Sequence, residues 1–192
     1  MKHLLSILLF TIFLAAAGTS HAAPPPAPGA KDSPTTGTLT FPAAGELPML
    51  QSIKDIQAVT TGHGSDLLVV NFWATFCAPC VEEMPYFVQL SQKYPEKRVR
   101  VVGLTVDLKS QVESVVKPFL KEKGIPYANF HLYADDQGDV IKFFSKDWDG
   151  ALPVTFFYDK SGNQIGHFLE PVTAEQLNGE VEKLLKQIDE KK

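Results

Sequence analysis

The sequence predicts an α/β fold in which a central mixed β-sheet is flanked by helices. Two buried apolar runs, residues 67–73 and 99–106, are each followed by a helical pattern, which is typical of parallel βα units. Two later β-rich runs, residues 154–158 and 164–169, are joined by a polar turn and predict an antiparallel hairpin. Parallel units followed by a hairpin predict a mixed sheet, and the helices of the chain are expected to cover both of its faces.

A short helix precedes the first strand, and a longer helix follows it. Ser52 is a typical N-cap for the short helix, and the Gly-His-Gly segment at residues 62–64 ends it. The longer helix begins at Cys77 or Ala78 and extends to about residue 93. Pro85 lies inside this helix and should kink it, because its nitrogen cannot donate a helical hydrogen bond. We expect the inward face of the longer helix to carry Val81, Met84, Val88 and Phe87.

The second half of the chain adds two helical segments, one strand and a last helix. Ser110-Gln111-Val112-Glu113 is a capping-box pattern and predicts a helix start, with apolar residues at helical spacing after it. Pro118 interrupts that pattern and either kinks the helix or starts a second one. Residues 128–133 predict a short strand, and residues 139–144 predict a helix. A second capping box at residues 173–176 begins an amphipathic final helix.

Three segments divide the chain. Lys2, an uncharged apolar stretch and the small residues around Ala22 predict a signal peptide over residues 1–22 that is cleaved on export, with an uncleaved membrane anchor as the alternative. Residues 23–36 are rich in proline and predict a linker. Residues 37–192 have the length of one domain. Export predicts a periplasmic protein, in a compartment where disulfides persist.

Composition argues against two classes of partner. The net charge of the chain is −4, and its Lys and Arg residues form no stripe interleaved with aromatic residues, so we expect no nucleic-acid binding. A structural zinc site requires four nitrogen or sulfur ligands, and there is only one pair of cysteines. His63, His131 and His167 are separated, so we interpret each as a structural residue and expect no stable metal.

Cys77-Ala78-Pro79-Cys80 contains both cysteines of the chain. A disulfide across so short a loop stabilises little, so a reactive role is favoured. Cys77 stands at a helix N-terminus, where unpaired N–H groups favour the thiolate, and we predict that it is the nucleophile. Cys80 lies one turn further along and is predicted to be the resolving thiol. No cofactor is expected besides this redox-active pair.

A family resemblance rests on these residues and their neighbours. Residues 70–80, Val-Asn-Phe-Trp-Ala-Thr-Phe-Cys-Ala-Pro-Cys, resemble the active-site segment of the thioredoxin superfamily. Residues 81–85, Val-Glu-Glu-Met-Pro, resemble its TlpA/ResA branch of exported proteins more narrowly. Residues 101–107 resemble the next strand of that branch, and residues 151–159 resemble the segment with its cis-proline. The similarity covers about residues 47–188.

The resemblance implies a thioredoxin fold with an insertion between Val106 and Pro153. It also implies that the bond between Leu152 and Pro153 is cis, that the backbone there pairs with a substrate peptide, and that Leu152 lines the substrate groove. Thioredoxins proper have a buried aspartate where this chain has Asn71, so that proton-transfer role is vacant. Glu83 is the implied replacement, since it shares a helix face with Cys80 and burial would raise its pKa. The alternative is that Glu83 is a solvated helix carboxylate like Glu82.

The resemblance also suggests which side chains contact a substrate. The predicted set is Trp73, Phe76, Pro79, Leu152 and Pro153. Phe76 stands where many relatives have tryptophan, and Trp73 is mostly a packing residue beside the site. Trp148 is either part of the binding surface or a core anchor.

The leading hypothesis is a periplasmic thiol:disulfide oxidoreductase that reduces disulfides in partner proteins with electrons from a membrane donor. Keeping cysteines reduced for cytochrome c maturation is one candidate use. The alternatives are a disulfide oxidase or isomerase of the same fold, or a non-catalytic redox or copper-binding module. Copper carriers of related fold usually have a wider cysteine spacing and a distal histidine. A peroxidase is disfavoured because Ala74 stands where those enzymes have threonine.

Overall fold

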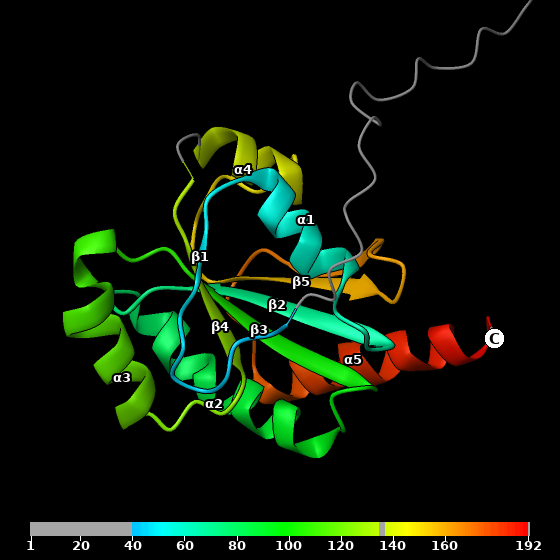
Figure 1. Ribbon diagram of the computed structural model, residues 1–192. Helices are drawn as coiled ribbons and strands as arrows, with labels where there is room; N and C mark the ends of the chain where they lie inside the picture. The colour runs from blue at the N-terminus through cyan, green and yellow to red at the C-terminus, as the bar shows by residue number, and fades with distance from the viewer. Residues whose placement is uncertain (1–39, 135–136, 192) are drawn as a thin grey trace, which may run out of the picture. The chain divides into compact units, whose positions relative to one another are not determined.

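The computed structural model describes residues 40–134 and 137–191, and a six-stranded sheet forms the centre of this part of the chain (Figure 1). The strands in spatial order are β1 (Met49–Leu50), β4 (Ala128–Leu132), β3 (Val99–Thr105), β2 (Leu67–Trp73), β5 (Val154–Asp159) and β6 (Gln164–Phe168). The first four strands are parallel, and β5 and β6 are antiparallel additions. The predicted α/β fold with a mixed sheet is confirmed.

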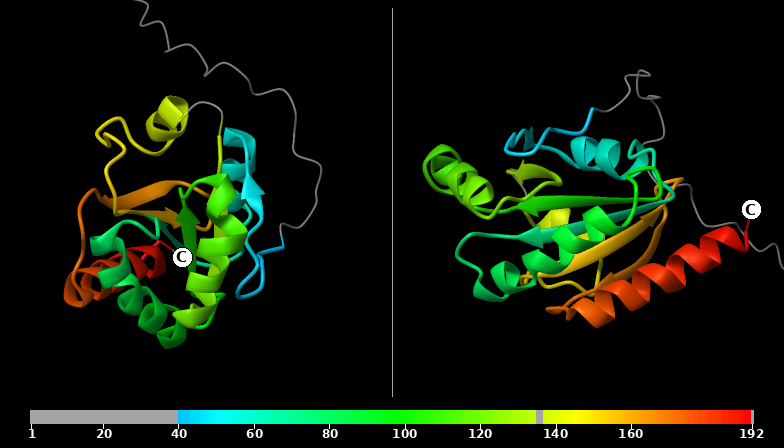
Figure 2. Two further views of the ribbon diagram at one scale, coloured as in Figure 1. Left: turned by 90° about the vertical axis from the view of Figure 1, so that its left-hand side faces the viewer. Right: turned by 90° about the horizontal axis from the view of Figure 1, so that it is seen from below.

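Helices cover both faces of the sheet (Figures 1 and 2). They are α1 (Ile53–Thr61), α2 (Ala78–Lys93), α3 (Lys117–Glu122), α4 (Gln137–Phe144) and α5 (Ala174–Asp189). One hydrophobic core joins α2, α3 and α5 to one face, and a second core joins α1 and α4 to the other. Successive residues of a strand point to opposite faces, so the central strand contributes to both cores.

All seven residues of β2 are buried, as its uninterrupted apolar run predicts. Val69 and Trp73 pack towards α2 and α5, whereas Val70 and Phe72 pack towards α1 and α4. Asn71 is the polar exception within this strand and is fully buried. The strand ends at Trp73, four residues before the cysteine pair.

The expected helix starts are confirmed at α1 and α5. Ser52 caps α1, and Asp55 completes a capping box there; Thr173 caps α5 in the same way. α2 continues through Pro85 to Lys93. Its inward face differs from the one expected, because Val81 and Val88 are only half-buried. The buried residues of α2 are Cys80, Glu83, Met84, Phe87 and Leu90.

Two further local predictions were incomplete or wrong. The two-residue strand β1 was not predicted, because a segment so short shows no periodicity. The predicted capping box at residues 110–113 does not form: a 3₁₀ turn (Lys109–Gln111) and a π-helical turn (Val112–Val116) occupy this region without a side-chain cap. α3 then begins at Lys117, so Pro118 belongs to the first turn of a new helix, where its missing N–H costs no bond.

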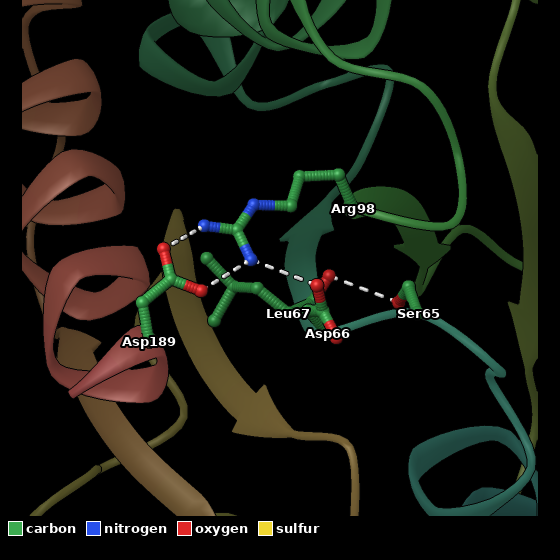
Figure 3. A network of polar contacts seen from close by, with 5 residues as sticks. All are labelled: Ser65, Asp66, Leu67, Arg98 and Asp189. Atoms are coloured by element: carbon green, nitrogen blue, oxygen red, sulfur yellow. Dashed lines mark hydrogen bonds and ion pairs between the residues drawn. The ribbon is translucent and has the colours of Figure 1, made fainter. Parts of the chain in front are cut away.

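An ion-pair network fixes the end of α5 to the start of β2 (Figure 3). The Arg98 guanidinium donates to Asp66 at 2.8 Å and to Asp189 near the end of α5 at 2.9 Å. Ser65 donates from its hydroxyl to the carbonyl oxygen of Leu67 at 3.0 Å in the same corner. These contacts lie at the amino end of β2, away from the cysteines.

The predicted signal peptide (1–22) and proline-rich linker (23–36) lie outside the described residues. Among the helices of residues 40–134 and 137–191, none combines the length and apolar character that crossing a membrane requires.

Candidate functional site

Cys77 and Cys80 form a disulfide at the N-terminus of α2. Cys77 is the N-cap residue, and its sulfur accepts a hydrogen bond from the backbone N–H of Cys80 at 3.3 Å. Cys77 is 9% exposed, whereas Cys80 is completely buried. A partner can therefore reach Cys77 first, and the helix N–H groups are placed to stabilise its thiolate after reduction. This is the placement expected of the nucleophile.

Glu83 is a buried carboxyl group one helical turn beyond Cys80. It is 2% exposed, and burial raises its pKa from 4.5 to about 7, although two hydrogen bonds act in the opposite direction. The backbone N–H of Val172 donates to Oε2 at 3.1 Å. A carboxyl group with this pKa can both accept and release a proton near neutral pH, and Glu83 shares the buried face of α2 with Cys80, as the predicted exchange requires.

Asn71 has a function that the sequence did not reveal. Its side-chain amide donates to Glu83 Oε1 at 2.8 Å and to Thr155 Oγ1 at 3.2 Å. The sequence indicates only that an acid/base group is missing at this position. Asn71 therefore holds the Glu83 carboxyl group, which extends from α2 into the buried space beside β2. Twelve residues separate the two in sequence, and no local pattern indicates their contact.

The loop before Cys77 is fixed by Asp107, which the sequence did not single out as a site residue. The Asp107 carboxylate accepts a hydrogen bond from the backbone N–H of Thr75 at 3.0 Å and another from the Thr75 hydroxyl. The hydroxyl of Thr105 donates to the same carboxylate. Asp107 is 2% exposed, so these bonds form in a buried setting. They connect the loop after β2 to the end of β3 and so position the cysteine segment.

The bond between Leu152 and Pro153 is cis, as the resemblance implied. Phe72 pairs with Val154, so the antiparallel register places Pro153 next to the carboxyl end of β2. Pro153 is buried at this point, whereas Leu152 is partly exposed. The segment before β5 therefore meets the loop that carries the cysteines.

Of the predicted substrate contacts, Trp73 is a packing residue, as the sequence also indicated. Its side chain is fully buried, its indole N–H donates to Asn129 Oδ1 at 3.1 Å, and its ring stacks on Phe119 at 5.6 Å between centroids. Trp73 cannot contact a substrate from this position, so its assignment to the binding surface was wrong. Phe76, in contrast, is 71% exposed and lies next to the cysteines in sequence.

A groove of about 590 Å³ lies beside Cys77. Three of the five predicted substrate contacts, Phe76, Pro79 and Leu152, line it, whereas the buried Pro153 does not. Trp148 lines it too, although this side chain is 6% exposed and its ring packs against Phe72 in the core. Trp148 is thus both a core anchor and a groove wall, which resolves the alternative that the sequence left open.

No group of three or more His, Cys, Asp or Glu residues suited to a metal ion occurs within residues 40–134 and 137–191. His63 is buried and bonded through Nε2 to the carbonyl oxygen of Asp159 at 2.8 Å. His131 donates from Nε2 to the carbonyl oxygen of Asp107 at 2.8 Å. These two histidines hold backbone groups in place.

Comparison with known proteins agrees with this geometry. A model of the AhpC/TSA family matches residues 44–164, which is more than half of the chain. The chain belongs to the AhpC/TSA family. Among curated members similar to it is a thiol-disulfide oxidoreductase ResA of Bacillus cereus, 36% identical over 115 residues that cover 60% of this chain and 61% of ResA. The similarity thus spans less than two thirds of that relative.

The chain is also similar to a second curated relative and to a solved structure. The sporulation thiol-disulfide oxidoreductase A of Bacillus subtilis is 25% identical over 146 residues, covering 71% of this chain and 85% of that protein. A crystal structure of a thioredoxin-family thiol:disulfide interchange protein from Chlorobium tepidum TLS aligns with a TM-score of 0.51 and 28% identity, over 64% of this chain and 81% of that one. The expected thioredoxin fold is confirmed.

Proposed function

We propose that this chain is a thiol:disulfide oxidoreductase that acts outside the cytoplasm and reduces disulfides in partner proteins. The observation that supports the proposal most directly is the asymmetry of the Cys77–Cys80 disulfide at the N-terminus of α2. Cys77 is 9% exposed and lines the groove, whereas Cys80 is buried one turn from a carboxyl group whose pKa is about 7. The names of the two curated relatives, both thiol-disulfide oxidoreductases, support the same activity.

The proposed reaction has two steps. The Cys77 thiolate attacks one sulfur of a partner disulfide; a mixed disulfide forms, the partner's S–S bond breaks, and the partner's other sulfur leaves as a thiolate that takes up a proton. Cys80 then gives its proton to Glu83 and attacks the Cys77 sulfur. The mixed disulfide breaks, the partner's second sulfur leaves as a thiolate that takes up a proton from solvent, and the Cys77–Cys80 disulfide closes. The partner has then gained two electrons and two protons, and Glu83 returns the Cys80 proton to solvent. A membrane donor is the proposed source of the electrons for the next cycle.

The signal-type segment at residues 1–22 supports a periplasmic location. The reductive direction agrees with the narrower resemblance around Glu83, and keeping cysteines reduced for cytochrome c maturation is one use for such a protein. An oxidase or isomerase would use the same geometry, so the reduction potential separates these functions. Equilibration with glutathione measures the reduction potential of the Cys77–Cys80 pair. A potential of about −120 mV, typical of a strong oxidant, would contradict the proposal that the protein reduces its partners.

A Cys80→Ala variant tests the two-step reaction itself. Without the resolving thiol, Cys77 should remain bound to its partners as mixed disulfides. On a non-reducing gel of the exported protein we expect additional bands that disappear on reduction. The double variant Cys77→Ala/Cys80→Ala is the matched control and should give none. A single band from Cys80→Ala would indicate a non-catalytic module, and the proteins in the additional bands would identify the partners.

A further inference from the structure

A buried carboxylate, that of Asp107, lies just beyond the carboxyl end of β3 and is held by neutral donors. Asp107 is 2% exposed and accepts hydrogen bonds from the backbone N–H of Thr75 at 3.0 Å, from the Thr75 hydroxyl and from the Thr105 hydroxyl. Both carboxylate oxygens act as acceptors, as they do in the ionised form. None of the ion pairs within residues 40–134 and 137–191 includes Asp107.

One peptide group connects this carboxylate to Cys77. The N–H of the peptide between Ala74 and Thr75 donates to Asp107, and the carbonyl oxygen of the same peptide accepts from the backbone N–H of Cys77 at 3.1 Å. Hydrogen bonds in such a chain polarise one another, so a negative charge at one end strengthens the bond at the other. Two hydrogen bonds and one peptide group therefore fix the Cys77 backbone relative to Asp107.

Two opposing influences act on the Cys77 sulfur. The sulfur lies at a helix N-terminus and accepts from the backbone N–H of Cys80 at 3.3 Å, which favours its thiolate. The Asp107 carboxylate acts in the opposite sense, because like charges close together in a buried setting disfavour each other. Solvent screens this repulsion little, since Asp107 is buried and Cys77 is 9% exposed. Asp107 therefore limits how far the helix N-terminus favours the thiolate.

Other titratable side chains reach this end of the described structure from neighbouring elements. His131 of β4 donates from Nε2 to the carbonyl oxygen of Asp107 at 2.8 Å, and its buried Nδ1 has no hydrogen-bond partner among the described residues. A second proton on this ring would find no acceptor there, so His131 does not neutralise the carboxylate. Lys109, two residues after Asp107, lies over the Tyr133 ring at 5.5 Å. Glu83 lies on the buried face of α2, and its contribution is the same in the wild type and in a variant of Asp107.

We infer that Asp107 is a positioning residue that restrains the Cys77 thiolate and thereby favours the reductive direction of exchange. The inference rests on the proposed function and adds a determinant of its direction. A thiolate that forms very readily is a weaker nucleophile and a better leaving group, which suits an oxidant. A thiol that loses its proton near the ambient pH attacks a disulfide fastest. Repulsion from Asp107 also makes the thiolate form of the reduced pair less stable, so the pair gives up its electrons more readily.

Asp107→Asn removes the charge and can keep all three donors in contact. The amide oxygen can accept from the Thr75 N–H and the Thr105 hydroxyl, and the amide nitrogen can donate to the Thr75 hydroxyl oxygen. The reduced proteins are alkylated with iodoacetamide over a range of pH, and the rate at Cys77 is followed by mass spectrometry. We expect the midpoint of this pH profile to fall by about one pH unit in Asp107→Asn, which is about tenfold more thiolate at a pH below both midpoints.

The reduction potential gives a second readout with its own dependence on pH. Neither the disulfide nor the protonated thiol carries a charge at Cys77, so wild type and Asp107→Asn should have equal potentials at acid pH. Above both midpoints Asp107→Asn should be about tenfold more reduced in equilibrium with glutathione, which corresponds to a potential about 30 mV less negative. A merely structural effect of the substitution would not make the difference grow with pH in this way.

Two variants control for charge and for loop geometry. Glu122 is exposed at the end of α3, so Glu122→Gln removes one solvated charge and should keep the wild-type midpoint. Thr75→Val removes one bond to Asp107 but keeps its charge, so the midpoint should not fall. If Asp107→Asn does not fold, carbon-13 NMR of the Asp107 carboxyl group in the reduced wild type replaces it. We expect an ionised carboxylate at neutral pH whose signal shifts as Cys77 loses its proton.

Each outcome separates the inference from the proposed function. Equal midpoints in wild type and Asp107→Asn, an equal fall in either control variant, or an Asp107 carboxyl group that is protonated at neutral pH would overturn the inference and leave the proposed function standing. A wild-type potential of about −120 mV would overturn the proposed function and the reductive role of Asp107 with it. A lower midpoint and a pH-dependent rise in potential, found in Asp107→Asn alone, support the inference.

Discussion

Replacing Glu83 with glutamine should remove a pH dependence that this carboxyl group gives to the stability of the oxidised protein. Burial raises the pKa of Glu83 from 4.5 in the unfolded chain to about 7 in the native state. Below pH 4.5 the group is protonated in both states. Between these pH values the native state keeps a proton that the unfolded chain has lost, so the free energy of unfolding falls as pH rises and levels off above pH 7.

The size of this effect follows from the two pKa values. A difference of about 2.5 pKa units corresponds to roughly 3 kcal/mol at 1.36 kcal/mol for each unit. Glutamine stays neutral and avoids this loss, but it accepts through one atom where Glu83 accepts from both Asn71 and Val172. One unmade bond to a buried donor costs about 1–3 kcal/mol at every pH. The stability of Glu83→Gln relative to wild type should therefore rise by roughly 3 kcal/mol between pH 4.5 and pH 8.

Urea unfolding of the oxidised proteins at several pH values measures this difference. Glu82→Gln is the matched control, because Glu82 is exposed on the same helix and its replacement should leave the pH profile unchanged. The reasoning would be refuted if the Glu83→Gln difference did not grow with pH. It would also be refuted if both variants gave the same profile, since burial could then not be the cause.

Three further predictions concern stability alone. Gly103→Ala should destabilise by about 2–4 kcal/mol in urea unfolding, because its Cβ would lie 1.9 Å from Asn129 Oδ1. Gly179→Ala on α5, where an added Cβ meets nothing within 4 Å, should instead stabilise by about 0.5–1 kcal/mol. Arg98→Met should cost about 1 kcal/mol through its ion pairs, including the one with Asp189, and thermal unfolding should show a smaller difference in 1 M salt. An equal difference at both salt concentrations would assign the loss to packing of the Arg98 side chain.

Local patterns predicted most of the fold. β2 follows from an uninterrupted apolar run, and the start of α1 follows from the cap at Ser52. Both features depend on residues that are neighbours in sequence, so a local pattern predicts them. The pattern at Ser110 was misleading, because the 3₁₀ turn already begins at Lys109, so Ser110 lies inside a turn and is not an N-cap. β1 depends on pairing with β4, about eighty residues away, and its two residues carry no signal of their own.

The candidate site was predictable where its chemistry lies within α2. The spacing of Cys77, Cys80 and Glu83 on one helix could be recognised, and the structure places the last two in the buried face. Trp73 was misassigned because sequence proximity to the cysteines says nothing about which way a strand residue points. The groove could not be predicted, since its walls come from loops after three strands and from α4, which meet only in the folded chain.

The alternation of β2 explains how one short segment serves two tasks. Asn71 points to the face where α2 packs, and it holds Glu83 beside Cys80. Phe72, the next residue, points to the opposite face and lines the groove with Trp148. Adjacent residues of a strand must face opposite sides of the sheet. The proposed proton transfer to the buried thiol and the proposed contact with a partner therefore use different faces of the sheet, and they meet at Cys77, which follows the end of this strand and caps α2.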